Sequence, residues 1–151
     1  MQVWRVFPQR FRETAFTGAG CLYVDGRWNH MGTAMVYTAT SRALAALEYF
    51  VNLDPGESPG ELFMAQATVP DKLIETFDDP QLPANWRELD NLRCRDLGSS
   101  WANSRRSLAL HVPSVVVDGD TNLLINPAHA DFSKVAVAEA IPFHFDPRMF
   151  R

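Results

Sequence analysis

The segment Gly26-Arg27-Trp28-Asn29, followed by Gly32, has little apolar content and places bulky side chains between glycines. Arginine presents a planar fork that matches two phosphate oxygens at once, and the neighbouring tryptophan offers a flat face for stacking. One interpretation is therefore an anion-binding loop beside a stacked aromatic ring. The other is a surface turn whose Trp28 is tucked into the core, and a short motif of this kind does not decide between them.

Glu48 interrupts an apolar helical stripe. Leu44, Leu47, Glu48 and Val51 have the i, i+3, i+4, i+7 spacing of the buried face of an amphipathic helix. A carboxylate on that face must be paired or must face a cleft, and breaks in a local pattern are common at functional sites. The alternative is a glutamate at the edge of the stripe that reaches solvent and pairs with a nearby arginine.

Two hydroxyl-bearing side chains are further candidates. In the run Met35-Val36-Tyr37-Thr38, side chains alternate, so Met35 and Tyr37 share one face of a strand. A tyrosine there either packs in the core, as is common in strands, or faces a ligand. Ser114 follows Pro113 and either binds a ligand or ends a strand. Because no G-x-S-x-G surrounds it, we do not expect a hydrolase nucleophile.

Other well-known motifs do not match. Gly18-Ala19-Gly20 does not continue to the third glycine of a dinucleotide fingerprint, and there is no Walker loop. The four histidines have no metal-ligand spacing, so we expect no metal site.

The elements that must position these residues are short. Strand-like composition occurs at residues 3–7, 35–38, 62–69, 108–112, 115–117, 123–125 and 135–141. A helix capped by Thr40 or Ser41 is predicted to run to about Phe50, and a second over residues 89–103 with Gly98 as a weak point. Since strands and helices do not alternate regularly, we expect an α+β fold with a mixed or antiparallel sheet.

Length and charge limit the class of protein. The 151 residues fit one domain, residues 1–151. A net charge of −4 without a basic arm argues against direct nucleic-acid binding. The two cysteines, Cys21 and Cys94, are too far apart for a C-x-x-C pair and predict no disulfide framework. With no signal-peptide pattern and no stretch near the roughly 18 to 20 apolar residues of a membrane span, we expect a cytoplasmic protein.

Many short motifs, taken in order, resemble the RES-domain family. They are Trp4-Arg5-Val6, Gly18, Gly20, Gly26-Arg27-Trp28-Asn29, Gly32, Val36-Tyr37-Thr38-Ala39, Ser41, Ala43-Leu44-Ala45, Leu47-Glu48, Leu82-Pro83, Trp86, Leu97-Gly98, Trp101, Val112-Pro113-Ser114, Asn126-Pro127, His129 and Phe145-Asp146-Pro147-Arg148. The Arg, Glu and Ser that give the family its name correspond to Arg27, Glu48 and Ser114. Asp25 stands where many members carry another glycine, which we expect to alter the loop rather than abolish the site.

The resemblance implies a fold similar to ADP-ribosyltransferases, with sheets around an NAD cleft and flanking helices. It also implies a bacterial toxin that consumes NAD as its substrate and is partnered by an Xre-like helix-turn-helix antitoxin. Any DNA contact is then expected through the antitoxin. The expected catalytic residues are Arg27, Tyr37 and Glu48.

The chemistry of NAD agrees with this resemblance. Arg27 could hold the pyrophosphate, and Tyr37 could stack on the nicotinamide. Cleavage of the nicotinamide–ribose bond develops positive charge on the ribose, which the Glu48 carboxylate could stabilise. Secondary contacts are expected from Trp28, Asn29, Ser114, Asn126 and Arg5.

The acceptor of the ADP-ribose stays open: water or phosphate gives hydrolysis or phosphorolysis, and a protein side chain gives ADP-ribosyl transfer. A non-catalytic module that only binds a nucleotide or partner is the remaining alternative. A DNA-binding repressor is disfavoured, because the balance of charge is acidic and no recognition-helix pattern occurs.

Overall fold

The computed structural model describes residues 1–78, 80 and 82–151. Its strands are β1 (Gln2–Pro8), β2 (Val36–Ala39), β3 (Leu62–Thr68), β4 (Ile74–Thr76), β5 (Ala109–Pro113), β6 (Thr121–Ile125), β7 (Ala136–Val137) and β8 (Ile141–Phe143). The α-helices are α1 (Arg42–Phe50) and α2 (Leu92–Ser104). Short 3-10 helices lie at Gln9–Phe11, Ala19–Leu22, Asp71–Leu73, Phe132–Lys134 and Pro147–Phe150.

Within this described part the eight strands form one sheet. Its order is β4-β5-β6-β2-β1-β3-β7, and β8 also pairs with β3. β4 runs parallel to β5, and the other neighbours are antiparallel. A mixed sheet with two α-helices in irregular order confirms the predicted α+β class.

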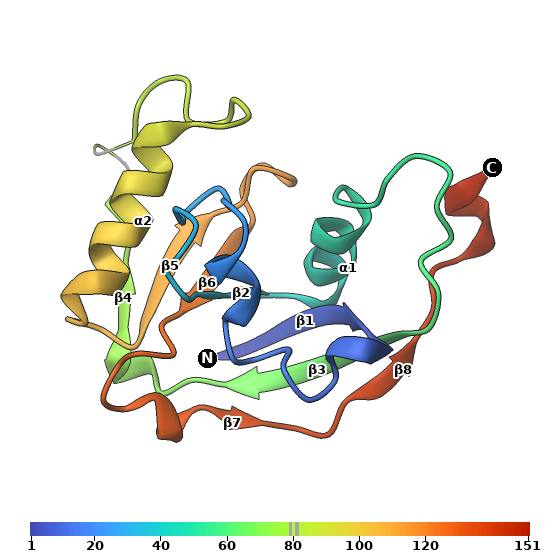
Figure 1. The fold of residues 1–151 in the computed structure, drawn as a ribbon, viewed down its shortest axis with the longest axis horizontal. Coiled ribbons are helices and arrows are strands. Elements are labelled where there is room, and N and C mark those ends of the chain that lie inside the picture. The colour runs from blue at the N-terminus through green and yellow to red at the C-terminus, as the bar shows by residue number, and fades with distance from the viewer. Residues whose placement is uncertain (79, 81) are drawn as a thin grey trace.

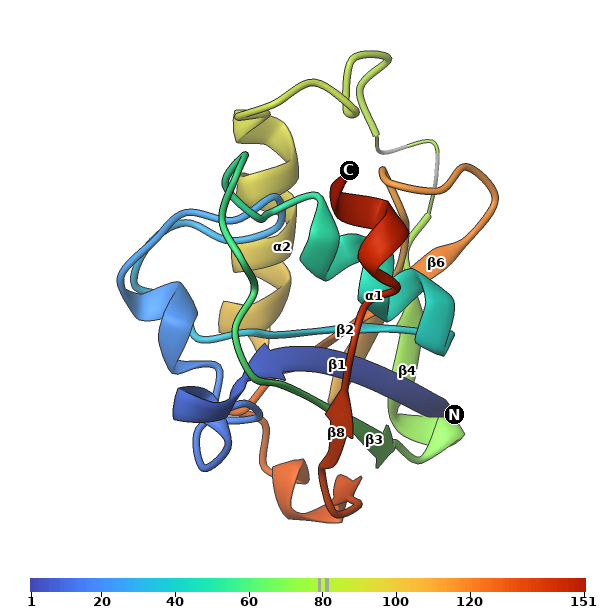
Figure 2. The same cartoon turned by 90° about the vertical axis from the view of Figure 1, so that its right-hand side faces the viewer.

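Both α-helices pack on the same face of the sheet (Figures 1 and 2). Helix α1 covers the β1 and β3 side, where Leu44 and Ala45 join Val6 and Met64 in a buried cluster. Helix α2 covers the β5 and β6 side through Cys94, Trp101 and Ala102. The opposite face of the sheet buries a second apolar layer that includes Val3, Val36, Leu123 and Ile125. The strands between the two helices are therefore free to line a site.

Strands β1 and β2 are joined by a single registered pair, Trp4 with Ala39. On their other sides the same strands are paired continuously, β1 with β3 over seven residues and β2 with β6 over four. Beyond Trp4 the two strands separate, and the Arg5 side chain bridges them by donating from Nη1 to the main-chain oxygen of Tyr37 at 2.8 Å. This opening in the sheet is the most important feature for the site.

Local signals set the ends of both α-helices. The Ser41 hydroxyl accepts the main-chain N–H of Leu44 at 3.0 Å, so Ser41 rather than Thr40 caps α1. The predicted stripe on α1 is only partly buried, because Val51 is 56% exposed. Helix α2 begins three residues later than predicted. Asp90 has φ of 58°, which takes it out of the helix, and Asn91 caps the first turn.

The predicted strand at residues 115–117 is wrong. The segment is a tight turn between β5 and β6, because the Ser114 hydroxyl accepts the main-chain N–H groups of Val116 at 3.1 Å and Val117 at 3.2 Å. These bonds replace the interstrand bonds that three β-branched residues would otherwise form.

The predicted strand at residues 135–141 is two strands. β7 and β8 both pair with β3, but their registers differ by one residue, so residues 138–140 lie opposite only Ala65 and Gln66. The β7–β8 segment therefore has one more residue than β3 at this point, which interrupts the strand pairing in the manner of a β-bulge. β4 was not predicted at all, since its three residues Ile74-Glu75-Thr76 give no alternation to recognise.

No helix in residues 1–78, 80 and 82–151 has both the length and the apolar content to cross a membrane. Cys21 and Cys94 are both free thiols.

Candidate active site

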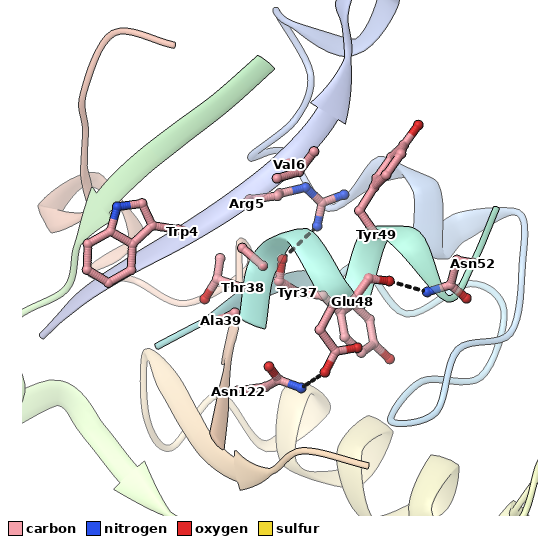
Figure 3. Close-up of a pocket in the computed structure, with 11 residues that line it drawn as sticks. Trp4, Arg5, Val6, Tyr37, Thr38, Ala39, Glu48, Tyr49, Asn52 and Asn122 are labelled. Carbon is pink, nitrogen blue, oxygen red and sulfur yellow. Dashed lines mark hydrogen bonds between the residues drawn. The ribbon is translucent and has the colours of Figure 1, made fainter. Parts of the chain in front are cut away.

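A cavity of about 260 Å³ lies where β1 and β2 separate, below α1 (Figure 3). It is lined by Trp4, Arg5, Val6, Tyr37, Thr38, Ala39, Ala45, Glu48, Tyr49, Asn52 and Asn122. Two larger and more open grooves lie elsewhere, one over the β5–β6 turn and one beside the C-terminal segment. Only the cavity between β1 and β2, of these three, brings Arg5, Tyr37 and Glu48 together, so we take it as the candidate active site.

Glu48 presents its carboxylate to this cavity from the second turn of α1. Its Oε1 accepts hydrogen bonds from Ser114 Oγ at 3.0 Å and from Asn122 Nδ2 at 2.6 Å. Figure 3 shows the carboxylate directed toward Asn122 on β6. Among the described residues Glu48 forms no ion pair. The polar break in the helical stripe is thus a carboxylate held by two neutral donors at the cavity wall.

Ser114 holds Glu48 from behind rather than lining the cavity. The residue is 1% exposed, and its hydroxyl accepts the two main-chain N–H groups of the β5–β6 turn. Since two donors already point at the oxygen, the hydroxyl hydrogen is directed to Glu48. Ser114 therefore fixes one carboxylate oxygen of Glu48 and the turn at the same time.

Tyr37 connects the cavity to the loop that precedes β2. Its ring lines the cavity, and its hydroxyl donates to Asn29 Oδ1 at 2.7 Å and accepts from the main-chain N–H of Trp28 at 3.0 Å. Burial raises the pKa of the Tyr37 phenol well above its ordinary value. The hydroxyl therefore stays protonated and keeps its bond to Asn29.

Arg5 provides a cation in the cavity wall. Burial lowers the pKa of its guanidinium from the ordinary value, while the nearby Cys21 and Tyr37 raise it. An arginine in a protein nevertheless remains charged. Its Nη1 is committed to the main chain of Tyr37, whereas its Nε is buried and has no partner among the described residues.

Arg27 does not line this cavity. Its Nη1 donates to the main-chain oxygens of Trp86 at 2.7 Å and Glu88 at 3.1 Å, which ties the loop to the segment before α2. Its charge lies close enough to Tyr37 to lower the pKa of the phenol, against the stronger effect of burial. Arg27 therefore lies near the hydroxyl end of Tyr37, outside the cavity itself.

Trp28 and Asn29 are packed inside the protein. Trp28 is 2% exposed and contacts Phe77 and Trp86, with ring centroids 5.6 and 6.3 Å away. Asn29 Nδ2 donates to main-chain oxygens of the same loop, those of Val24 and His30 at 3.1 Å being the shorter bonds. In this structure both residues hold the Tyr37 hydroxyl from the side of the protein interior. Trp28 itself is packed in the core, as the second interpretation of this segment predicted.

Asn126 lies away from the cavity. It is buried at the end of β6, where Nδ2 donates to the main-chain oxygen of Ala102 at 2.8 Å and Oδ1 accepts from the main-chain N–H of Ala128 at 3.0 Å. These bonds join the C-terminal part of α2 to the chain after β6.

Asn122 is a site residue that the sequence did not reveal. It lies 74 positions from Glu48 and is surrounded by ordinary strand residues. The one available signal was an amide side chain directly before the apolar run at residues 123–125, which is buried. In the described part of the chain, no three His, Cys, Asp or Glu side chains gather in a group that could hold a metal ion.

The family is identified by comparison with known proteins. The RES domain family matches residues 2–146. The chain belongs to the RES domain family. It is 39% identical to the "Prs ADP-ribosylating toxin" of Sphingobium sp. (strain YBL2), over 98% of this chain and 96% of that protein. It is 34% identical to "Toxin Res" of Yersinia enterocolitica, over 99% of each chain, and 34% identical to "Toxin Res" of Pseudomonas putida, over 99% of this chain and all of that one.

A solved structure shares the fold of this RES domain. A chain of the M. tuberculosis MbcT-MbcA toxin–antitoxin complex superposes with a TM-score of 0.72 at 15% identity, covering 99% of this chain and 86% of that one. At this identity the similarity describes the fold: a mixed sheet with two helices on one face.

Proposed function

We propose that this RES domain is the toxin of a toxin–antitoxin pair and cleaves the nicotinamide–ribose bond of NAD, with Glu48 at the reacting centre. The observation that carries the proposal is the Glu48 carboxylate, held at the cavity wall by Ser114 and Asn122. Three relatives of this chain are named as toxins, and these names support the role of toxin.

The two partners of Glu48 suit this chemistry because they are neutral. A carboxylate paired with an arginine has much of its charge compensated, whereas one held by a hydroxyl and an amide keeps a full negative charge for the substrate. Both bonds go to Oε1, and Oε2 accepts none from the described residues. The second oxygen is therefore available to the substrate.

The reaction follows from that charge. As the bond between ribose C1 and the pyridinium nitrogen breaks, its electron pair leaves with the neutral nicotinamide, and positive charge develops on the ribose. A fixed carboxylate beside C1 stabilises that charge without having to reorganise. An acceptor oxygen or nitrogen then bonds to C1 and loses its proton.

Tyr37 and the two arginines supply binding in this proposal. The Tyr37 ring is a flat surface for nicotinamide, held in place by the hydroxyl bonds to the loop. Arg5 offers a buried positive charge in the cavity wall. Arg27 contacts the pyrophosphate with Nε and Nη2, which make no hydrogen bonds to the described residues while Nη1 holds the loop. The opening between β1 and β2 would then be the NAD cleft of an ADP-ribosyltransferase-like fold.

The acceptor is the open part of the reaction. The relative named as an ADP-ribosylating toxin favours a protein acceptor over water or phosphate. The test is to incubate the purified protein with NAD, with and without phosphate, and with labelled NAD in a bacterial lysate. Free ADP-ribose indicates hydrolysis, a phosphorylated ADP-ribose indicates phosphorolysis, and a labelled protein band indicates transfer.

A matched control separates catalysis from binding. Glu48→Gln keeps the shape of the side chain and loses the charge, so it should still bind NAD but cleave it at least about 10²-fold more slowly. Intact NAD in every condition would contradict the proposal and leave a non-catalytic binding module. Equal turnover by the wild-type protein and Glu48→Gln would contradict the role of Glu48.

The partner in this proposal is an antitoxin with an Xre-like helix-turn-helix domain. The support is the fold shared with a chain of a toxin–antitoxin complex. If a small gene for a helix-turn-helix protein lies directly upstream, co-expression of its product should restore the growth of cells that the toxin alone arrests, and the two proteins should co-purify. Growth arrest that persists beside the co-expressed partner contradicts it.

A further inference from the structure

Three buried polar atoms have no hydrogen-bond partner among the described residues: Trp4 Nε1, Arg5 Nε and Asn122 Oδ1. All three belong to residues that line the cavity between β1 and β2. Buried polar atoms in proteins are nearly always hydrogen-bonded, so a group of them around one cavity points to a polar ligand there. Two of the atoms are donors, and Asn122 Oδ1 is the acceptor.

The orientation of the Asn122 amide is fixed by its neighbour. An ionised carboxylate only accepts hydrogen bonds, so the amide atom 2.6 Å from Glu48 Oε1 must be the nitrogen. The oxygen then faces away from Glu48. The main chain of Asn122 is also fixed, because it is paired with Ala39 on one side and Val112 on the other.

We propose that Asn122 serves the reaction with both ends of its amide. Nδ2 positions the Glu48 carboxylate, and Oδ1 accepts a hydrogen bond from a hydroxyl of the nicotinamide ribose of NAD. This inference rests on the proposed function and extends it to the recognition of the sugar. A ribose hydroxyl is favoured over the nicotinamide amide, because Asn122 lies one hydrogen bond from the carboxylate that faces C1, and the C2 hydroxyl is the donor next to that carbon.

The positioning role is tested with Asn122→Asp, which has nearly the same shape. It replaces the N–H donor that faces Glu48 with a second acceptor. At neutral pH the two carboxylates repel each other, and kcat for NAD cleavage should fall about ten- to hundredfold, the range for losing a hydrogen bond to a charged group.

The pH profile distinguishes positioning from a purely structural effect. As the pH is lowered, the carboxyl pair in Asn122→Asp takes up a proton, the protonated side chain donates to its neighbour again, and part of the lost activity should return. Asn103→Asp, the same substitution on the exposed face of α2, should keep both the wild-type rate and the wild-type pH profile. Wild-type kcat in Asn122→Asp, or a loss of equal size at every pH, overturns the positioning role.

The sugar contact is tested with NAD analogues. In the wild-type protein, removal of the C2 hydroxyl of the nicotinamide ribose should lower kcat/KM by about tenfold or more, whereas in Asn122→Ala the same change should cost less than about twofold. Equal discrimination by both proteins overturns the contact. A second analogue carries a carboxylate in place of the nicotinamide amide. If Asn122→Ala loses discrimination against this analogue alone, Oδ1 contacts the amide, and the ribose contact is overturned.

Melting temperatures identify variants that fail to fold. If Asn122→Ala fails, Asn122→Leu, which has a similar shape and no acceptor, provides the analogue comparison in its place. Wild-type protein that leaves NAD intact overturns the proposed function, and the sugar contact with it. Wild-type activity that is indifferent to both Asn122 variants overturns the role of Asn122 alone.

Discussion

At the scale of single residues, the site depends on how the side chains around Glu48 and Tyr37 share their hydrogen bonds. Ser114 and Asn122 both donate to one carboxylate oxygen, and Trp28 and Asn29 both contact one phenol oxygen. Each functional group is therefore held by two partners, which for Glu48 come from distant parts of the chain and for Tyr37 from the loop just before its strand. Substitutions that preserve shape can separate the chemistry of these groups from their structural role.

Glu48→Gln should remove activity without lowering stability. The amide oxygen of glutamine can still accept from Ser114 and Asn122, but the negative charge that stabilises the ribose cation is gone. We expect kcat for NAD cleavage to fall about 10²- to 10³-fold, as when one preorganised electrostatic group is lost. Product release measured by chromatography and thermal melting measured by circular dichroism check the two halves of this prediction. A melting temperature that drops together with activity would assign Glu48 a structural role instead.

Tyr37→Phe should destabilise the protein. The hydroxyl is both donor to Asn29 and acceptor from Trp28, and its removal leaves two buried groups unsatisfied. The expected loss is about 1–3 kcal/mol in the free energy of unfolding, measured in urea. Tyr23→Phe, on a side chain that is 75% exposed, is the matched control and should have no effect. Equal stability of the two variants contradicts the bracing role of the phenol.

The residue scale also shows where the sequence was informative. Glu48 was visible as a polar break in a helical stripe, because the neighbours that made it anomalous are local. Asn122 was not, since its partner lies on another element and an amide in a strand has many ordinary explanations. Arg27 looked like an anion ligand from its type alone, and nothing in the sequence indicated that main-chain oxygens of Trp86 and Glu88 would take up its Nη1.

At the scale of elements, local sequence signals predicted where most helices and strands lie. Tertiary contacts caused the differences between the predicted and the observed elements. Ser41 capped α1 where a capping residue was expected, because capping involves groups three residues apart. The valines at 115–117 form a turn because the Ser114 hydroxyl accepts the main-chain N–H groups of Val116 and Val117. The break between β7 and β8 depends on the register with β3, which no local pattern encodes.

Gly98 shows how closely two elements approach. A β-carbon at this position of α2 would overlap the main-chain oxygen of Trp28. Gly98→Ala should therefore destabilise the protein by about 3 kcal/mol or more, although alanine favours an isolated helix by about 1 kcal/mol. Gly20→Ala, at a glycine with no atom within 4 Å of the added carbon, is the control and should be near neutral in chemical denaturation. A stable Gly98→Ala would mean that α2 can move away from the loop.

At the scale of the whole molecule, the sheet edge at β4 depends on a charged anchor. Glu75 accepts bidentate hydrogen bonds from Arg106 and a further one from Ser107, so the short parallel strand is tied to the end of α2. The bonds from Arg106 lower the pKa of Glu75 from its ordinary value. Folding thus favours the ionised form of this carboxyl.

The pH dependence of stability should report this anchor. Because the folded-state pKa of Glu75 lies below the unfolded one, its contribution is present above the unfolded pKa of about 4.5 and is lost as the pH falls through the folded value. Denaturation at pH 6 and pH 3 should show a larger loss for wild type than for Glu75→Gln. Since the pair is partly exposed, the difference should be about 1 kcal/mol or less. Identical losses in the two proteins would contradict the anchor.

The opening between β1 and β2 also has a mechanical consequence. One residue pair and the Arg5 side chain join the two parts of the sheet on either side of the cavity. A molecule that fills the opening and contacts both walls adds a link between the two parts of the sheet. Binding of the substrate should therefore make the whole domain more rigid.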